Sequence, residues 1–346
     1  MKLLVFCILA LVLLAAAGGG FLFWMKQQPL YKPGQAVELI LEPAVAGDQP
    51  MWRVGEDVEI NHFSKGSGRN ILYVHGGPGI PPSLSAPALD GLGERFRVNY
   101  YDQRGTGKST RPFDNEAWSS GAWQNIQELE GTLGIAQQIA DIERIRRILG
   151  EETLILVGHS YGGLLASLYS AEFPDRVEKL VLIAPADLLL FPSPHGDLFA
   201  SIRSGLSARD RTAFDGWADE YLDLGTIFEK STGELETLDS KFPRFFEQAM
   251  GDLPEGSGGD VGVWHARAQY FSLGQRHDWR GAISAYNGPT LILHGENDLQ
   301  TIEVSKMYAD ALPDARVETI TGAGHFPHYT QPDQTTSVLL DFLVRN

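Results

Sequence analysis

The fold of this chain is decided by the stretch Leu154-Ile155-Leu156-Val157-Gly158-His159-Ser160-Tyr161-Gly162, an apolar run that leads directly into a helix-like segment. A strand that turns sharply into a helix places the central serine in a strained backbone conformation. Glycine two positions on either side lets the two elements pass closely. The strain exposes the hydroxyl of Ser160 at the carboxyl end of the sheet, where the first helical turn directs its free N–H groups. The pattern predicts a nucleophilic serine; the alternative is a tight turn that needs glycine only for its shape.

A nucleophilic serine requires a base, and the base requires an orienting acid; on a turn of this kind the chain order is serine, acid, histidine. Residues 289–295 read as a buried strand followed by Glu296-Asn297-Asp298, and residues 315–320 alternate like a further strand followed by Gly322-Ala323-Gly324-His325. The carboxyl ends of parallel strands meet at one edge of a sheet. We therefore predict Asp298 as the acid and His325 as the base.

Other residues could take these parts. Glu296 is the alternative acid and His328 the alternative base. His159 adjoins Ser160, but it is expected to point to the opposite side of the turn, and we interpret it as a packing residue.

Acyl transfer also needs donors for an oxyanion. The backbone N–H of Tyr161 is one candidate, because it follows the serine. Residues 70–74 read as an earlier strand, and the loop after it is His75-Gly76-Gly77-Pro78-Gly79. Pro78 has no N–H and glycine allows close approach of the backbone, so Gly77 is the predicted second donor. The alternative is a tight turn whose glycines only supply positive φ.

This loop, followed by Asp102-Gln103-Arg104-Gly105, resembles the prolyl aminopeptidase (proline iminopeptidase) branch of the α/β-hydrolase fold, from about residue 37 to the C-terminus. The resemblance implies Ser160, Asp298 and His325 as a triad, with Gly77 and Tyr161 as oxyanion donors. It further implies that the turn 102–105 supports the oxyanion loop without doing chemistry. Aminopeptidases of this family hold the substrate ammonium with acidic lid side chains, a part that the sequence assigns to no particular residue here.

The 346 residues alternate apolar strands with amphipathic helices, which predicts an α/β fold with a mainly parallel sheet flanked by helices. In the helix expected over 134–149, isoleucines share one stripe, and Glu143, Arg144 and Arg147 are expected largely outside. Residues 187–287 contain helix-like segments and no good strand, and are predicted to be a helical lid. The hydrolase core then comprises 37–186 and 288–346.

Residues 1–28 differ in character. Residues 3–25 are apolar and long enough to span a bilayer, with Lys2 before them and Lys26 after. We expect an uncleaved transmembrane signal anchor that places the catalytic domain outside the cytoplasm, in the periplasm or extracellular space; cleavage and secretion is the alternative. The single cysteine, Cys7, lies in this segment, so the exported domain has no thiol.

The net charge of −16 argues against nucleic-acid binding. No cluster of histidines, cysteines and carboxylates has metal-ligand spacing, so neither a metal nor an organic cofactor is expected.

The sequence thus predicts a serine hydrolase. The leading substrate is a small peptide or amide with a free N-terminus, proline in particular. A small carboxylic ester is the alternative, because the form His159-Ser160-Tyr161-Gly162-Gly163 is equally common among esterases and lipases of the fold. A noncatalytic binding module on the same fold is a remote third possibility.

Overall fold

The computed structural model describes residues 28–39, 50–113, 118, 121–251, 253–255 and 260–344. Within these residues, eight strands form one sheet in the order β1-β2-β4-β3-β5-β6-β9-β10. β1 pairs with β2 and β2 with β4 in antiparallel fashion, and the remaining neighbours are parallel. The predicted mainly parallel α/β sheet is therefore confirmed. The strands are β1 (Met51–Arg53), β2 (Glu59–Gly66), β3 (Arg69–Val74), β4 (Phe96–Tyr101), β5 (Leu154–His159), β6 (Val177–Ile183), β9 (Thr290–Gly295) and β10 (Ala315–Ile320).

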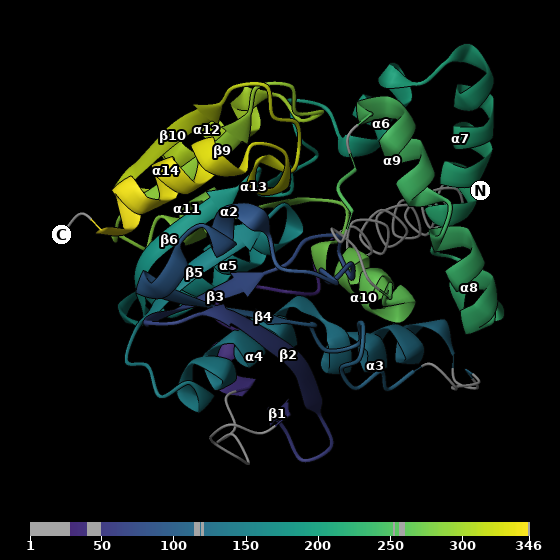
Figure 1. Cartoon of the computed structure of the whole chain (residues 1–346). Coiled ribbons are helices and arrows are strands. Elements are labelled where there is room, and N and C mark those ends of the chain that lie inside the picture. Colours follow the sequence, from purple (N-terminus) through teal and green to yellow (C-terminus); the bar gives the residue numbers. More distant parts are fainter. Residues whose placement is uncertain are drawn as a thin grey trace, which may run out of the picture.

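Helices cover both faces of this sheet (Figure 1). One face packs against α4, α5, α11 and α12, and the other against α2 and α14. Since both faces are covered, the central strands are buried throughout and mostly apolar: all six residues of β5 and of β9 are buried. The core helices are α2 (Pro87–Asp90), α3 (Ala122–Leu133), α4 (Ile135–Ile148), α5 (Tyr161–Glu172), α11 (Arg280–Ile283), α12 (Ile302–Ala311), α13 (Pro327–Thr330) and α14 (Pro332–Val344).

The expected outward position of Glu143 and Arg144 in α4 is wrong, because both side chains are buried and paired. Arg144 Nη1 lies 2.7 Å from Asp141 Oδ1, and Glu143 accepts a hydrogen bond from Tyr169 at 2.9 Å. Only Arg147 is partly exposed, with 29% of its side-chain surface accessible. The amphipathic pattern cannot anticipate this, because the charges are neutralised by ion pairs within α4 itself, Arg144 with Asp141 and Glu143 with Arg146 and Arg147.

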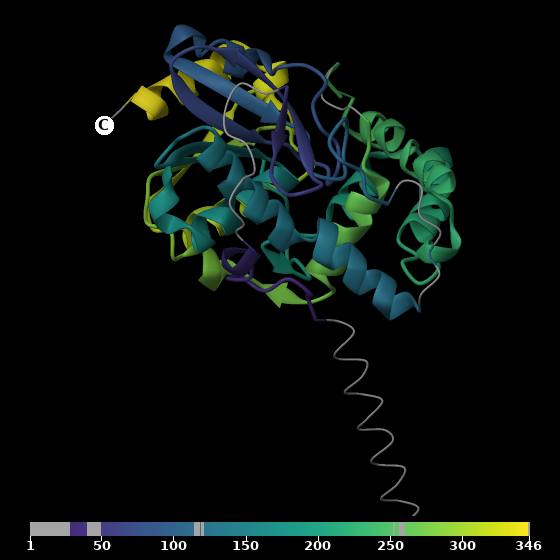
Figure 2. The same cartoon turned by 90° about the horizontal axis from the view of Figure 1, so that it is seen from below.

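The chain between β6 and β9 is mostly helical. Figures 1 and 2 both show α6–α9 as a layer to one side of the sheet core, with α10 between this layer and the core. The sequence predicted no good strand in this region. The structure has two short strands there, of two residues each, which pair with each other. The elements are β7 (Leu190–Phe191), α6 (Leu198–Gly205), α7 (Ala208–Tyr221), α8 (Thr232–Asp239), α9 (Phe242–Met250), α10 (Val263–Leu273) and β8 (His277–Asp278).

The predicted anchor falls almost entirely on residues 1–27, which lie outside the described residues. Among the helices that the structure does describe, none combines the length and the apolar character needed to cross a bilayer.

Candidate active site

Ser160 lies between the end of β5 and the start of α5, with φ 52° and ψ −120°. A positive φ is unfavourable for a residue with a side chain, and it is tolerated here because the surroundings fix the backbone. A Cβ on Gly162 would overlap the carbonyl oxygens of Val74 and His75, and one on Gly158 would overlap the backbone of Gly162. The sequence therefore folds into the sharp strand-to-helix turn that its glycines predict.

Asp298 follows β9 and His325 follows β10, so both emerge at the sheet edge where β5 delivers Ser160. His325 Nδ1 lies 3.0 Å from Asp298 Oδ1 and 3.1 Å from Oδ2. Burial by itself raises the pKa of Asp298, but the His325 imidazole and the N–H of Gln300 outweigh it, so the pKa lies below its ordinary value. The carboxylate is thus ionised and accepts the Nδ1 proton, which leaves the lone pair of Nε2 available.

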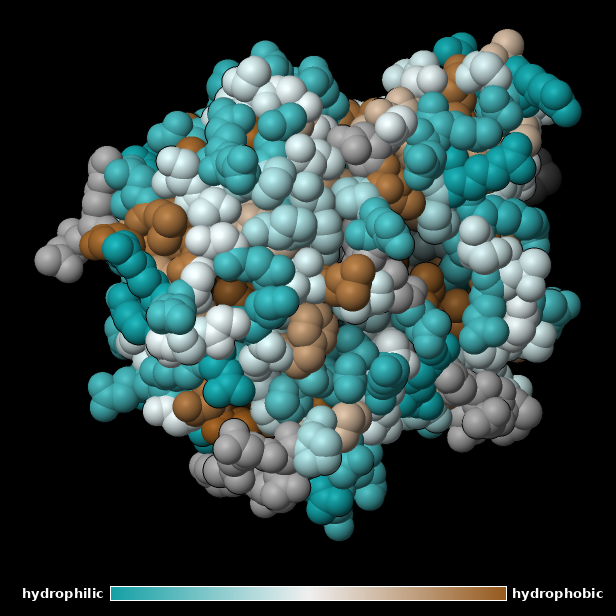
Figure 3. All heavy atoms as spheres, viewed as in Figure 1, coloured by the Kyte–Doolittle hydropathy of each residue, from teal (hydrophilic) through white to brown (hydrophobic). Residues whose placement is uncertain are grey.

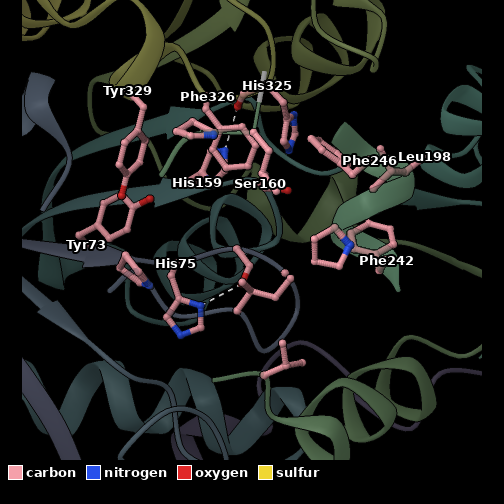
Figure 4. A pocket seen from close by; sticks show the side chains of 18 residues that line it. Tyr73, His75, His159, Ser160, Leu198, Phe242, Phe246, His325, Phe326 and Tyr329 are labelled. Atoms are coloured by element: carbon pink, nitrogen blue, oxygen red, sulfur yellow. Dashed lines mark hydrogen bonds between the residues drawn. The ribbon is translucent and has the colours of Figure 1, made fainter. Parts of the chain in front are cut away.

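Ser160 and His325 line the same pocket, and Figure 4 shows the His325 ring beside the serine. Within the part of the chain that the structure describes, the Ser160 hydroxyl has no hydrogen-bond partner, so no internal contact occupies it. Catalytic hydrogen bonds are often long without substrate.

The alternative residues are directed elsewhere. Glu296 accepts a hydrogen bond from the N–H of Gly322 at 2.9 Å. His328 is fully buried, and its Nε2 lies 3.1 Å from the Tyr73 hydroxyl. His159 packs as expected against the rings of His325 and His328, but its expected direction is wrong, because it also lines the pocket beside Ser160.

The glycine-rich loop supplies backbone N–H groups to the same pocket. Gly77 has φ 122°, a conformation that favours glycine, and it lines the pocket with Ser160. Among the described residues, neither the N–H of Gly77 nor that of Tyr161 has an acceptor. Tyr161 is the first residue of α5, where helix geometry leaves the N–H free.

The turn 102–105 supports this loop, as the resemblance implies. The N–H of Gln103 donates to His75 Nε2 at 3.1 Å, and the Gln103 side chain donates to the His75 carbonyl at 2.9 Å. His75 Nδ1 therefore carries the proton and donates to the Gly76 carbonyl at 2.9 Å. Arg104 anchors the turn to α4 through two bonds to Asp141, of 2.6 and 2.7 Å. Both ring nitrogens of His75 are therefore occupied by the supporting bonds.

The pocket lined by Ser160 and His325, called the main pocket below because it holds the candidate site, has a volume of about 330 Å³ and a largely apolar lining. Its lid side is formed by Leu198, Phe242 and Phe246, and Tyr73 and Tyr329 lie at the opposite side (Figure 4). No described side chain that lines it is acidic.

A side pocket of about 50 Å³ adjoins it and shares Gly77 with it. Asp239, at the end of α8, lines this side pocket. One of its oxygens is paired with the buried Arg267, and the other has no partner in the described structure. The hydroxyls of Tyr221 and Tyr270, 3.2 Å apart, belong to the same wall. The sequence carried no signal for Asp239, because α8 and α10 meet only in the folded lid.

Residues 69–332 match the family described as alpha/beta hydrolase fold, and the match covers more than half of the chain. The chain therefore belongs to the alpha/beta hydrolase fold family. It is 27% identical over 292 residues to a proline iminopeptidase of Lactobacillus delbrueckii subsp. bulgaricus, which covers 79% of this chain and 89% of that protein. It is also 25% identical over 308 residues to a putative non-heme chloroperoxidase of Synechocystis sp., covering 85% and 99% of the two chains.

A solved structure, the bromoperoxidase from Bacillus anthracis, matches with a TM-score of 0.55 and 25% identity, covering 83% of this chain and 96% of that one. The resemblance to prolyl aminopeptidases is confirmed by the similarity to proline iminopeptidases, and the family supports a hydrolase.

Proposed function

We propose that this protein is a serine hydrolase that works by acyl transfer. The observation that carries the proposal is the strained Ser160 in the same pocket as an imidazole held by a buried carboxylate. In this mechanism His325 Nε2 takes the hydroxyl proton of Ser160 as the oxygen attacks a carbonyl carbon. Asp298 keeps the other nitrogen protonated and stabilises the imidazolium.

The oxyanion of the tetrahedral intermediate would be stabilised by the N–H groups of Gly77 and Tyr161. His325 then gives its proton to the leaving group, which departs as an amine or alcohol. His325 next takes a proton from water as the water oxygen attacks the acyl-enzyme. When the bond to the Ser160 oxygen breaks and the acid leaves, His325 returns this proton to that oxygen and restores the serine hydroxyl.

For the substrate we propose a small peptide or amide with a free N-terminus, of the kind that the name proline iminopeptidase denotes in the relatives. The side pocket supports this choice. The free oxygen of Asp239 is an acceptor for an amine N–H, and Asp239 lines the same side pocket as Gly77, the proposed oxyanion donor. A buried acceptor without a partner is costly unless a ligand satisfies it.

An ester of an apolar acid is the second candidate, and the main pocket favours it. Its lining is apolar, and burial lowers the pKa of both His75 and His159 to about 3, so these two histidines are neutral. Such a pocket binds an uncharged acyl group well and an ammonium group poorly.

The aminopeptidase and esterase proposals can be separated with the wild-type protein. The rates of hydrolysis are compared for proline p-nitroanilide, its N-acetyl derivative and p-nitrophenyl butyrate. The aminopeptidase proposal expects acetylation to lower kcat/KM for the anilide at least about tenfold, because a buried amine contact is lost. Preference for the ester, with no loss on acetylation, would overturn the aminopeptidase proposal but leave acyl transfer standing.

Variants then locate the amine site. Asp239→Asn should raise KM for the free anilide and leave ester hydrolysis unchanged. Asp215→Asn is the matched control, because Asp215 lies in the same lid but is exposed and paired with Arg203. Equal effects of the two variants would remove Asp239 from the amine site.

We also propose that the domain is anchored to the membrane by residues 1–28 and works outside the cytoplasm. Residues 28–39, where the described chain begins, are hydrogen-bonded to the hydrolase domain. The proposed anchor and the domain would therefore be joined by a short connection. The N–H of Tyr31 donates to the Ser272 carbonyl at 3.2 Å and that of Ala36 to Glu172 at 2.9 Å. Protease treatment of intact spheroplasts should digest the domain; full protection until lysis would contradict an external location.

A further inference from the structure

His159 joins the two parts of the candidate active site that come from different strands. It is the last residue of β5, directly before Ser160, and its Nε2 lies 2.9 Å from the carbonyl oxygen of His325. The centroids of the two rings are 5.1 Å apart (Figure 4). One short contact therefore connects the serine turn with the histidine loop, 166 residues further along the chain.

The partner defines the protonation of the ring. A carbonyl oxygen can only accept a hydrogen bond, so Nε2 must carry the proton. His159 is 5% exposed, and it is surrounded by His325, His328 and Phe326. Burial and the neighbouring His325 lower its pKa to about 3, against an opposing effect of the hydrogen bond to the His325 carbonyl, so the ring stays neutral at ordinary pH. The contact is therefore a pH-insensitive N–H to carbonyl bond.

Two other polar groups of His325, Nδ1 and the backbone N–H, are also bonded. Its Nδ1 donates to Asp298, and its backbone N–H lies 3.4 Å from the sulfur of Met250, the last residue of α9 in the lid. Thioether sulfur is a weak acceptor, so the Met250 contact restrains the loop less than a carbonyl bond would. Asp298 sets the rotation of the ring, but it does not set the distance of the His325 backbone from Ser160. Among the hydrogen bonds of the described residues, the bond from His159 joins the serine turn directly to the His325 backbone.

We propose that His159 is a positioning residue that holds the backbone of His325 at the serine turn, so that base and nucleophile remain within reach. The inference rests on the proposed acyl-transfer function. It assigns His159 no contact with the reacting atoms. Its effect is on kcat, since small displacements of a catalytic group cost about a hundredfold in rate.

A pair of variants tests this role with p-nitrophenyl butyrate as substrate. His159→Leu removes the donor and should lower kcat by about 10- to 100-fold with KM within about twofold. His159→Gln keeps an amide N–H and should recover most of the lost rate. His277→Gln is the control, because His277 is a buried histidine bonded to main-chain carbonyls outside the pocket, and it should leave kcat unchanged.

Two outcomes of the kinetics overturn the proposal: wild-type kcat in His159→Leu, or equal losses in the Leu and Gln variants. A measurement on the unaltered protein does not depend on the folding of any variant. In ¹⁵N-labelled protein, the His159 ring should show a proton on Nε2 and no titration between about pH 5 and 8. A proton on Nδ1, or titration in that range, would also overturn it.

The failure of this inference and that of the proposed function are distinguishable. If Ser160→Ala abolishes hydrolysis while His159→Leu retains full kcat, only the positioning role is wrong. If Ser160→Ala retains full activity, the proposed function itself fails, whatever the state of the His159 ring.

Discussion

Asp298 determines which nitrogen of His325 faces the pocket. Its two oxygens lie 3.0 and 3.1 Å from Nδ1, so the proton stays there and Nε2 is free to act as base. Asp298→Asn should therefore lower kcat by about a thousandfold or more, because an amide can present its N–H to Nδ1 and stabilise the wrong tautomer. Steady-state hydrolysis of p-nitrophenyl butyrate measures the loss.

Glu296→Gln is the matched control for this prediction. Glu296 is two residues away and bonds to Gly322, so its removal should change kcat by less than about threefold. A larger loss for Glu296→Gln than for Asp298→Asn would exchange their assignments.

Among single residues, those that directly follow the ends of strands could be predicted from the sequence. Ser160, Asp298 and His325 lie where chain order and strand positions predict. Asp239 and Arg267 were missed, because they come from separate lid helices without any shared motif. The direction of His159 was also missed, because alternation along a strand is disturbed where the chain turns into α5.

At the scale of elements, β3, β5 and β9 were predicted because each is a short apolar run followed by turn residues, and β10 was predicted from its alternation. No prediction was made for β1, β2 and β4, and β2 is largely polar. The helix expected over 134–149 is α4, Ile135–Ile148, and its isoleucine stripe is buried in the core. The buried charges of α4 could not be predicted, because Arg104 reaches Asp141 from a turn more than thirty residues away.

Two glycines in helices give opposite predictions for stability. Gly162→Ala should destabilise the fold by about 2–4 kcal/mol, because the new methyl group would overlap the backbone of β3 and its loop. Gly131→Ala, in α3, meets no atom within 4 Å and should stabilise the fold by about 0.5–1 kcal/mol. Urea unfolding of both variants measures these changes; destabilisation by Gly131→Ala comparable to that by Gly162→Ala would contradict the packing argument.

At the scale of the whole molecule, the surface is consistent with the charge of −16. Figure 3 shows one face on which hydrophilic residues predominate and hydrophobic residues form small separate patches. The lid has its own aromatic cluster, which includes Phe214, Trp217 and Phe245, so it packs largely on itself. Composition could predict the aromatic content of the lid, but it could not show which rings turn toward the pocket.

Stability should depend on pH through Glu130, which joins α3 to the lid helix α10 by accepting a hydrogen bond from Ser272. Burial raises the pKa of Glu130 to about 7, although the Ser272 hydroxyl opposes the shift. Between about pH 4.5 and 7, Glu130 keeps its proton in the folded state and has lost it in the unfolded chain. The stabilising contribution is therefore complete below about pH 4.5 and is lost as the pH rises through 7.

Glu130→Gln should remove this dependence. As the pH rises from 5 to 8, the free energy of unfolding of the variant should increase by about 1–2 kcal/mol relative to that of the wild type. This is less than the pKa change of Glu130 would give in full, because the side chain is partly exposed. Urea unfolding at both pH values measures the gain, with the exposed Glu128→Gln as control. If the variant and the wild type differed in free energy of unfolding by the same amount at pH 5 and at pH 8, the pH dependence could not be assigned to Glu130.

The central claim is that Ser160 is a nucleophile activated by His325. Its most direct test is labelling of the native protein with a fluorophosphonate, followed by mass spectrometry of the peptides. We predict a single adduct on Ser160, absent from Ser160→Ala and strongly slowed in His325→Gln. An unlabelled wild-type protein, or an adduct on another residue that persists in Ser160→Ala, would contradict the account.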